Sequence, residues 1–82
     1  MPALFNVLGH NVVIYTHDHR PAHVHVEGPD GSCVFQLNCP LGPLSLRETR
    51  GLALARVRRL ARGIEHAIGR LCAEWERIHG HH

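Results

Sequence analysis

The spacing of apolar residues changes once along the chain. From Leu4 to Leu46 they come in short runs separated by turn-forming residues, whereas from Leu52 onward they recur every three or four residues. Short runs between turns are typical of β-strands, and the longer spacing is typical of an amphipathic helix. The sequence therefore predicts a β-sheet over about residues 3–48, followed by one long helix over about residues 52–79.

Two hairpins are predicted within the sheet region. Residues 4–8 and 12–15 are joined through Gly9, a residue that can adopt a positive φ without strain. Residues 23–27 alternate between polar and apolar side chains and are separated from the next run, 32–37, by Gly-Pro-Asp-Gly, a strong turn signal. Antiparallel pairing of neighbouring strands is the arrangement expected from such short connections.

The segment 38–50 fits two structures. Ser45 and Glu48 have the spacing of a capping box, which would begin the helix early. The run 43–46 instead alternates like a short strand after several turn-forming residues, and we favour the strand. The predicted fold class is therefore α+β: an antiparallel β-meander of four or five strands, packed against one long C-terminal α-helix in a single domain.

The predicted helix has an apolar side that is expected to cover one face of the sheet. Gly63 and Gly69 each lower helix propensity by about 1 kcal/mol relative to alanine, so packing must hold the helix together. Trp75 is expected in the core. The apolar side comprises Val57, Leu60, Ala61, Ile64, Ala67, Ile68, Leu71, Cys72, Trp75 and Ile78.

Length and composition restrict the class of protein. With 82 residues, 44% of them hydrophobic and 20% charged, the chain is expected to form one small globular domain rather than a disordered segment. No apolar run approaches the roughly 20 residues of a membrane helix, and the N-terminus lacks the basic flank of a secretory signal. These features predict a cytoplasmic protein.

The three cysteines form no Cys-x-x-Cys pair. This argues against a disulfide framework and predicts that the cysteines are small buried side chains.

Basic residues are concentrated in one stretch. All nine basic residues are arginines, and residues 47–62 contain six of them against one acid, Glu48. Those on the predicted helix are expected on the face opposite the apolar side. A basic surface is typical of proteins that bind phosphates or an acidic partner, although a simply solvated helix face has the same composition. The candidate binding residues are Arg20, Arg47, Arg50, Arg56, Arg58, Arg59 and Arg62.

Histidines are concentrated where the third predicted strand begins. Because residues two apart in a strand share a face, His23 and His25 are expected side by side, while the intervening valines point to the core. A strand His-x-His pair can offer two nitrogens to one metal ion, with a third ligand from Asp18 or His19. His17 is a further candidate. The same rings could act as an acid–base pair, or could fill a buried strand end and hydrogen-bond to backbone carbonyls.

The segment from Tyr15 to Val26, Tyr-Thr-His-Asp-His-Arg-Pro-Ala-His-Val-His-Val, resembles the signature of a bacterial family known as domain of unknown function 4160. The likeness extends to the Met-Pro start, an early phenylalanine, and a helix that follows a glycine and carries a late tryptophan. In this chain the residues that match are Met1, Pro2, Phe5, Asp18, His19, Pro21, His23, His25, Gly51 and Trp75. Ala22 stands where a second proline is common in the family.

The resemblance implies a small protein often encoded beside a member of another small family, domain of unknown function 2442, in an arrangement similar to a toxin–antitoxin pair. The leading hypothesis is a non-enzymatic component of such a module. It would bind a small cognate protein from a neighbouring gene, or a nucleic acid, through the arginines and the histidine-rich strand edge. No membrane partner is expected, and an exposed edge strand permits a homodimer.

Two other classes of function are kept open. One is a hydrolase or ribonuclease in which His19, His23 and His25 are catalytic, with or without a metal. The other is a metal-binding or sensing module that holds zinc, nickel or copper through Asp18 and these histidines. The end of the chain, residues 80–82, is expected to be a flexible tail or a tag remnant, so metal bound by His81 and His82 would say nothing about this site.

Overall fold

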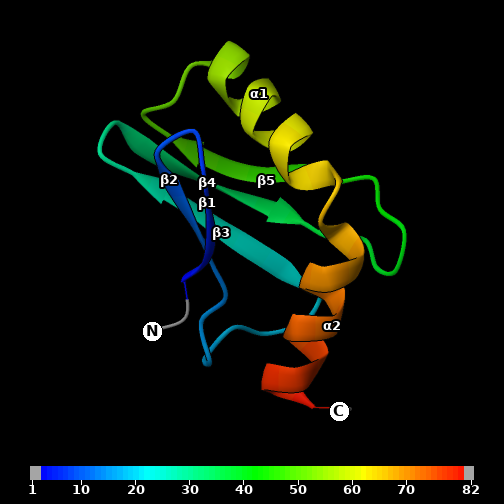
Figure 1. The fold of residues 1–82 in the computed structure, drawn as a ribbon. Coiled ribbons are helices and arrows are strands. Elements are labelled where there is room, and N and C mark those ends of the chain that lie inside the picture. The colour runs from blue at the N-terminus through cyan, green and yellow to red at the C-terminus, as the bar shows by residue number, and fades with distance from the viewer. Residues whose placement is uncertain (1–2, 81–82) are drawn as a thin grey trace.

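Consecutive strands lie side by side in one five-stranded antiparallel sheet, and two helices cover one of its faces (Figure 1). The computed structural model describes residues 3–80, so Met1, Pro2 and most of the expected tail lie outside the described residues. The α+β class and the five-stranded meander are confirmed. The elements are β1 (Ala3–Val7), β2 (His10–Val13), β3 (His23–Gly28), β4 (Gly31–Gln36), β5 (Ser45–Arg50), α1 (Leu54–Glu65) and α2 (Ile68–His79).

Tight turns set the register of the hairpins. Leu8 and Gly9 both have positive φ, 49° and 78°, which matches the twist of a two-residue hairpin turn between β1 and β2. The β3–β4 hairpin closes at the pair Gly28–Gly31. Residues 45–50 form a strand paired with β4, so the strand interpretation of this segment is correct and no helix begins at Ser45.

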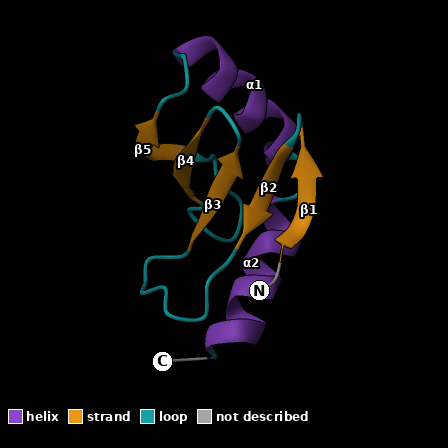
Figure 2. Cartoon of the chain, turned by 90° about the vertical axis from the view of Figure 1, so that its left-hand side faces the viewer, coloured by secondary structure: helices purple, strands orange, loops and turns teal. Residues whose placement is uncertain are grey.

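The prediction of one long helix is wrong, because the helical region breaks at His66 and Ala67 (Figure 2). A straight helix over residues 52–79 would be about 42 Å long at 1.5 Å per residue, which exceeds the 35 Å longest dimension of the chain. At the break, Ala67 N–H donates to the carbonyl of Ile64 and φ reaches −108°. The break directs α2 down the end of the sheet, beside the β2–β3 loop.

Gly63 lies where α1 comes close to β1. A Cβ atom at this position would be 2.6 Å from Cγ2 of Val7, so the absence of a side chain allows the close approach. Neither helix is long and apolar enough to cross a membrane, among the residues described.

Alternation along β3 separates the core from the histidines, as predicted. Val24 and Val26 are fully buried and pack in the core with residues of both helices. Trp75 is also buried in this core, at 1% exposure. His23 and His25 point to the other face of the sheet, the face that the helices leave uncovered.

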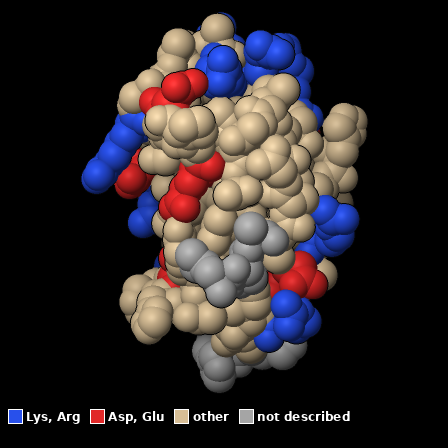
Figure 3. All heavy atoms as spheres, turned by 60° about the vertical axis from the view of Figure 1, so that its left-hand side comes forward, with Lys and Arg blue, Asp and Glu red and all other residues tan. Residues whose placement is uncertain are grey.

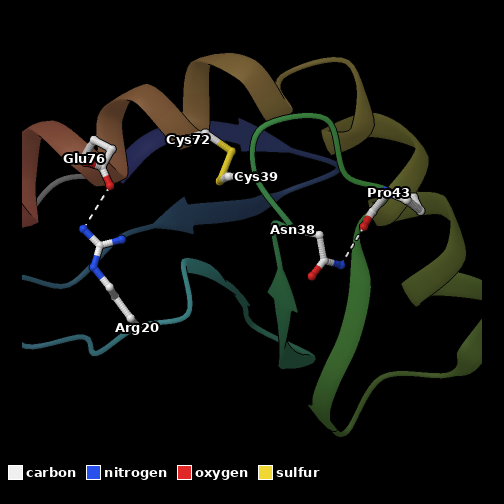
Figure 4. Close-up of a disulfide and its surroundings, with 6 residues drawn as sticks. All are labelled: Arg20, Asn38, Cys39, Pro43, Cys72 and Glu76. Atoms are coloured by element: carbon white, nitrogen blue, oxygen red, sulfur yellow. Dashed lines mark hydrogen bonds and ion pairs between the residues drawn. A yellow bond between two sulfur atoms is a disulfide. The ribbon is translucent and has the colours of Figure 1, made fainter. Parts of the chain in front are cut away.

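The prediction that all three cysteines are free is wrong. Cys39, in the loop after β4, forms a disulfide with Cys72 of α2, with the Cα atoms 5.9 Å apart (Figure 4). The two residues are 33 apart in the sequence, and only the docking of α2 against the end of the sheet brings them together. Cys33 is free and buried, as expected, and Cys72 is buried on the apolar side of its helix.

Candidate functional site

Asp18 is held in the loop between β2 and β3 by its own backbone and side chain. The Tyr15 N–H donates to Oδ2 of Asp18 over 3.0 Å, and the Asp18 N–H donates to the Tyr15 carbonyl over 3.1 Å. Such paired local bonds are typical of aspartate in turns. They orient the carboxylate so that its other oxygen, Oδ1, faces the start of β3.

Two imidazoles meet at this carboxylate oxygen. Nε2 of His25 lies 3.0 Å from Asp18 Oδ1, and Nε2 of His23 lies 3.5 Å from the same atom. The candidate ligand atoms of Asp18, His23 and His25 all lie within 4.8 Å of one another. The structure therefore brings together three of the four residues that the sequence analysis assigned to a metal site.

The hydrogen bond made by the other ring nitrogen of His23, Nδ1, indicates which of the two nitrogens carries the proton. Nδ1 is 2.9 Å from the carbonyl oxygen of Pro21, which can only accept a hydrogen bond, so Nδ1 donates. In a neutral ring Nε2 then carries a lone pair that points toward Asp18. Two acceptors face each other across 3.5 Å, an arrangement that a cation between them, or a second proton on the ring, would stabilise.

The site is largely enclosed. The His23 side chain is 6% exposed and that of Asp18 is 11% exposed, whereas His25 remains 24% exposed. The Tyr15 ring packs edge-on against the His25 ring, with the ring centroids 4.8 Å apart. The ring centroids of Trp75 and His23 are 6.4 Å apart. A ligand would reach the site from the side of His25 or of the loop.

Tyr15 and Glu27 extend the polar cluster along the uncovered face. The Tyr15 hydroxyl donates to the Glu27 carboxylate, with oxygen distances of 2.7 and 2.8 Å. This hydrogen bond, helped by partial burial and by the charges of Glu27 and Asp18, raises the pKa of Tyr15 to about 12. Tyr15 was not among the predicted site residues, because the two partners are 12 residues apart and no spacing rule connects them.

The end of α2 clamps the loop that carries Asp18. Arg20 pairs with Glu76 over 2.9 Å (Figure 4). It also donates to the Gly80 carbonyl and lies over the Trp75 ring at 5.0 Å. His79 stacks on Trp75, and its Nε2 is 3.1 Å from the Tyr15 carbonyl. Arg20, predicted as a binding residue, therefore also joins the loop to the helix.

The remaining predicted residues lie outside the cluster. His19 and His17 are exposed, and neither belongs to the group around Asp18. Arginine side chains are visible at the end of the molecule where α1 begins (Figure 3). Of the six predicted arginines other than Arg20, Arg56 is half-buried and five are exposed; the exposed set is Arg47, Arg50, Arg58, Arg59 and Arg62.

One comparison with known proteins gives a match. A family model described as "Domain of unknown function (DUF4160)" matches residues 9–76, a range that contains the whole cluster, both helices up to Glu76 and all but the first strand. No curated protein and no solved structure matches the chain.

Proposed function

The chain belongs to the DUF4160 family, and we propose that its function includes binding of a divalent transition-metal ion by Asp18, His23 and His25. The observation that carries the proposal is the approach of one carboxylate oxygen to two imidazole nitrogens, at 3.0 and 3.5 Å. In a tetrahedral zinc site with bonds of about 2.1 Å, ligand atoms lie about 3.4 Å apart. The two Asp18 distances are close to this spacing, whereas the candidate atoms as a group lie within 4.8 Å of one another, so the two histidine rings would move together by up to about 1.4 Å to hold one ion.

The surroundings of the ligands support the proposal. Ligating histidines commonly donate their other N–H to a backbone carbonyl, and His23 does so to Pro21. Two imidazoles and one carboxylate suit zinc, nickel or copper. Three protein ligands leave at least one coordination position for a further molecule. A hydrolase that uses a bound metal would need the same three ligands, so a test of metal binding comes before a test of turnover.

Thermal unfolding with and without Zn²⁺ tests the metal site. All proteins in the test carry His81→Ala and His82→Ala, so that the chain end does not bind metal. An ion that binds only the folded protein raises Tm by on the order of 10 °C at a hundredfold excess over its Kd. Asp18→Asn and His25→Ala should abolish this rise.

Two features keep the test specific. In the Asp18→Asn variant the amide retains an oxygen for the Tyr15 N–H, so the loop should still fold. His17→Ala removes an exposed histidine next to Asp18 and should leave the Zn²⁺ effect intact. The proposal fails if Zn²⁺ does not raise the Tm of the parent protein, or if the rise survives in both site variants.

A second candidate function is binding of a nucleic acid or of an acidic cognate protein, as a small cytoplasmic component of a toxin–antitoxin-like module. One observation favours it: within residues 3–80, five of the seven arginines assigned to binding have no ion-pair partner. Arginines without an ion-pair partner remain available to phosphates. The five are Arg47, Arg56, Arg58, Arg59 and Arg62.

Binding to a short RNA at several salt concentrations tests this second function. If two arginines are replaced, as in Arg58→Gln with Arg62→Gln, affinity should fall and the slope of log K against log salt should become shallower by about 1–2. Arg77→Gln, on the other helix and paired with Glu74, is the control and should change neither. Absence of RNA binding at low salt, or equal salt slopes in all variants, would contradict the hypothesis for RNA.

A further inference from the structure

A hollow of about 200 Å³ adjoins the candidate metal site. Its walls come from the loop that carries Asp18 and from the last turns of α2, and they are Asp18, His19, Arg20, Trp75 and His79. Asp18 is the one acidic residue of this lining, and it is also a proposed metal ligand. The other polar side chains of the lining are Arg20, His19 and His79, and Arg20 carries the fixed positive charge among them.

Arg20 is already oriented at the rim of the hollow. Its guanidinium lies over the Trp75 ring at 5.0 Å, and its Nη2 donates to Glu76 and to the Gly80 carbonyl. These bonds use one of its three nitrogens. Nη1 and Nε have no hydrogen-bond partner among residues 3–80. Because the side chain is already held in place, a ligand that accepts bonds from them costs little additional side-chain entropy.

We propose that this hollow binds a small oxyanion of the phosphate class, which also coordinates the metal held by Asp18, His23 and His25. The inference rests on the proposed metal site and names the chemistry of its further ligand. Arg20 would donate to the anion, and His19 lines the same wall. The volume is below the roughly 300 Å³ at which pockets begin to hold drug-sized ligands, so it suits a free anion better than a nucleotide.

The metal and the anion should bind cooperatively. Without a metal, the negative charge of Asp18, a residue of the lining, disfavours an anion in the hollow. With a divalent ion bound, the local charge becomes positive, and the ion also offers a coordination position. Coupling between two ligands is reciprocal, so phosphate should raise the affinity for the metal by the same factor as the metal raises the affinity for phosphate.

Isothermal titration calorimetry with inorganic phosphate tests the inference, in the background that lacks His81 and His82. We expect phosphate to bind the Zn²⁺-loaded protein at least tenfold more tightly than the metal-free protein. Arg20→Gln should weaken phosphate binding at least about tenfold, as expected for loss of a charged hydrogen bond. The same change should leave the Zn²⁺ affinity measured without phosphate within about threefold.

Matched variants separate the loss of the guanidinium from a loss of structure. Glu76→Gln removes the charge of the ion pair but keeps an oxygen that can accept the bond from Arg20, so it should not weaken phosphate binding. Arg70→Gln removes an arginine that also lies over an aromatic ring, Phe5, at 5.2 Å, and phosphate binding should be unchanged. Arg20→Lys keeps the charge but loses the planar fork, so it should give an intermediate affinity.

The outcomes distinguish this inference from the proposed function. If Zn²⁺ does not bind, both are wrong. If Zn²⁺ binds but phosphate does not, or if phosphate binds equally with and without Zn²⁺, the metal site stands and the anion site is overturned. Equal phosphate affinity in Arg20→Gln and the parent protein would also overturn it. A mononucleotide that binds more tightly than inorganic phosphate would overturn the assignment to a small free anion.

Discussion

At the scale of single residues, Asp18 organises the site because its two carboxylate oxygens contact different groups. Oδ2 accepts the Tyr15 N–H and fixes the loop, whereas Oδ1 lies between the Nε2 atoms of His23 and His25. An acid that satisfies a turn on one side can present a defined oxygen on the other without an added ordering cost. An asparagine in its place keeps the turn and removes the charge, which makes Asp18→Asn the most informative single substitution.

Tyr15 gives the protein a predictable sensitivity to alkaline pH. Because the pKa of its phenol rises from 10.0 to about 12 in the fold, the folded state favours the protonated form. The resulting stability is complete below about pH 10 and is lost as the pH rises through 12. Tyr15 is partly exposed, so we expect a loss of about 1 kcal/mol in the free energy of unfolding.

Urea unfolding of the wild type and of Tyr15→Phe between pH 8 and pH 12 measures this effect. Burial also raises the pKa of the Cys33 thiol to about 11, which adds a loss of the same sign between about pH 9 and 11. That step remains in Tyr15→Phe, whereas the tyrosine step should disappear. Identical pH profiles above pH 10 would show that the Tyr15–Glu27 hydrogen bond does not stabilise the fold.

At the scale of elements, α2 is the part of the fold that encloses the site. Its first half is tied by Cys72 to the loop after β4, and its last turns hold the β2–β3 loop through Glu76, Trp75 and His79. The helix break at Ala67 accompanies this arrangement, because it lets α2 run in a different direction from α1 (Figure 1). A substitution that loosens the packing of α2 is therefore expected to alter the positions of His23 and His25.

The disulfide between Cys39 and Cys72 should stabilise the fold substantially. A crosslink between residues 33 apart restricts the unfolded chain by about 3–4 kcal/mol in the chain-entropy treatment. The double variant Cys39→Ser, Cys72→Ser should lose about this much free energy of unfolding relative to the oxidised wild type, as measured by urea denaturation.

Reduced wild type serves as the control for that comparison and should match the double variant. A thiol titration should find no reactive cysteine in the oxidised native protein and one, Cys33, after unfolding. If the oxidised wild type and the double variant unfold at the same urea concentration, the crosslink does not contribute to stability in solution.

At the scale of the whole molecule, the arginines of α1 and the histidine cluster lie at different ends. The histidine cluster is at the end of the sheet where β3 begins, beside the last turns of α2, whereas α1 begins at the opposite end with its exposed arginines (Figures 1 and 3). Because no residue of the cluster belongs to α1 or β5, metal binding and nucleic-acid binding can be tested by separate substitutions. A loss of one in the variants of the other would indicate coupling through the fold.

The sequence determined the elements that depend on local chemistry. The turn residues and the alternation from His23 to Val26 specified the hairpins, the valine core and the shared face of the two histidines, because a strand has a period of two. Asp18 was proposed as a ligand beside this histidine pair, and the antiparallel pairing of β2 with β3 returns the loop that carries it to the start of β3.

Tertiary structure alone decided the features that depend on distance between residues far apart in the chain. These features are the helix break at His66 and Ala67, the Cys39–Cys72 bond formed where α2 docks, and the Arg20–Glu76 pair, which joins residues 56 apart. Exclusion of His19 from the cluster, and inclusion of Tyr15 beside it, depend on how the loop between β2 and β3 folds. Local periodicity carries no information on such placements, because they are set by how whole elements pack.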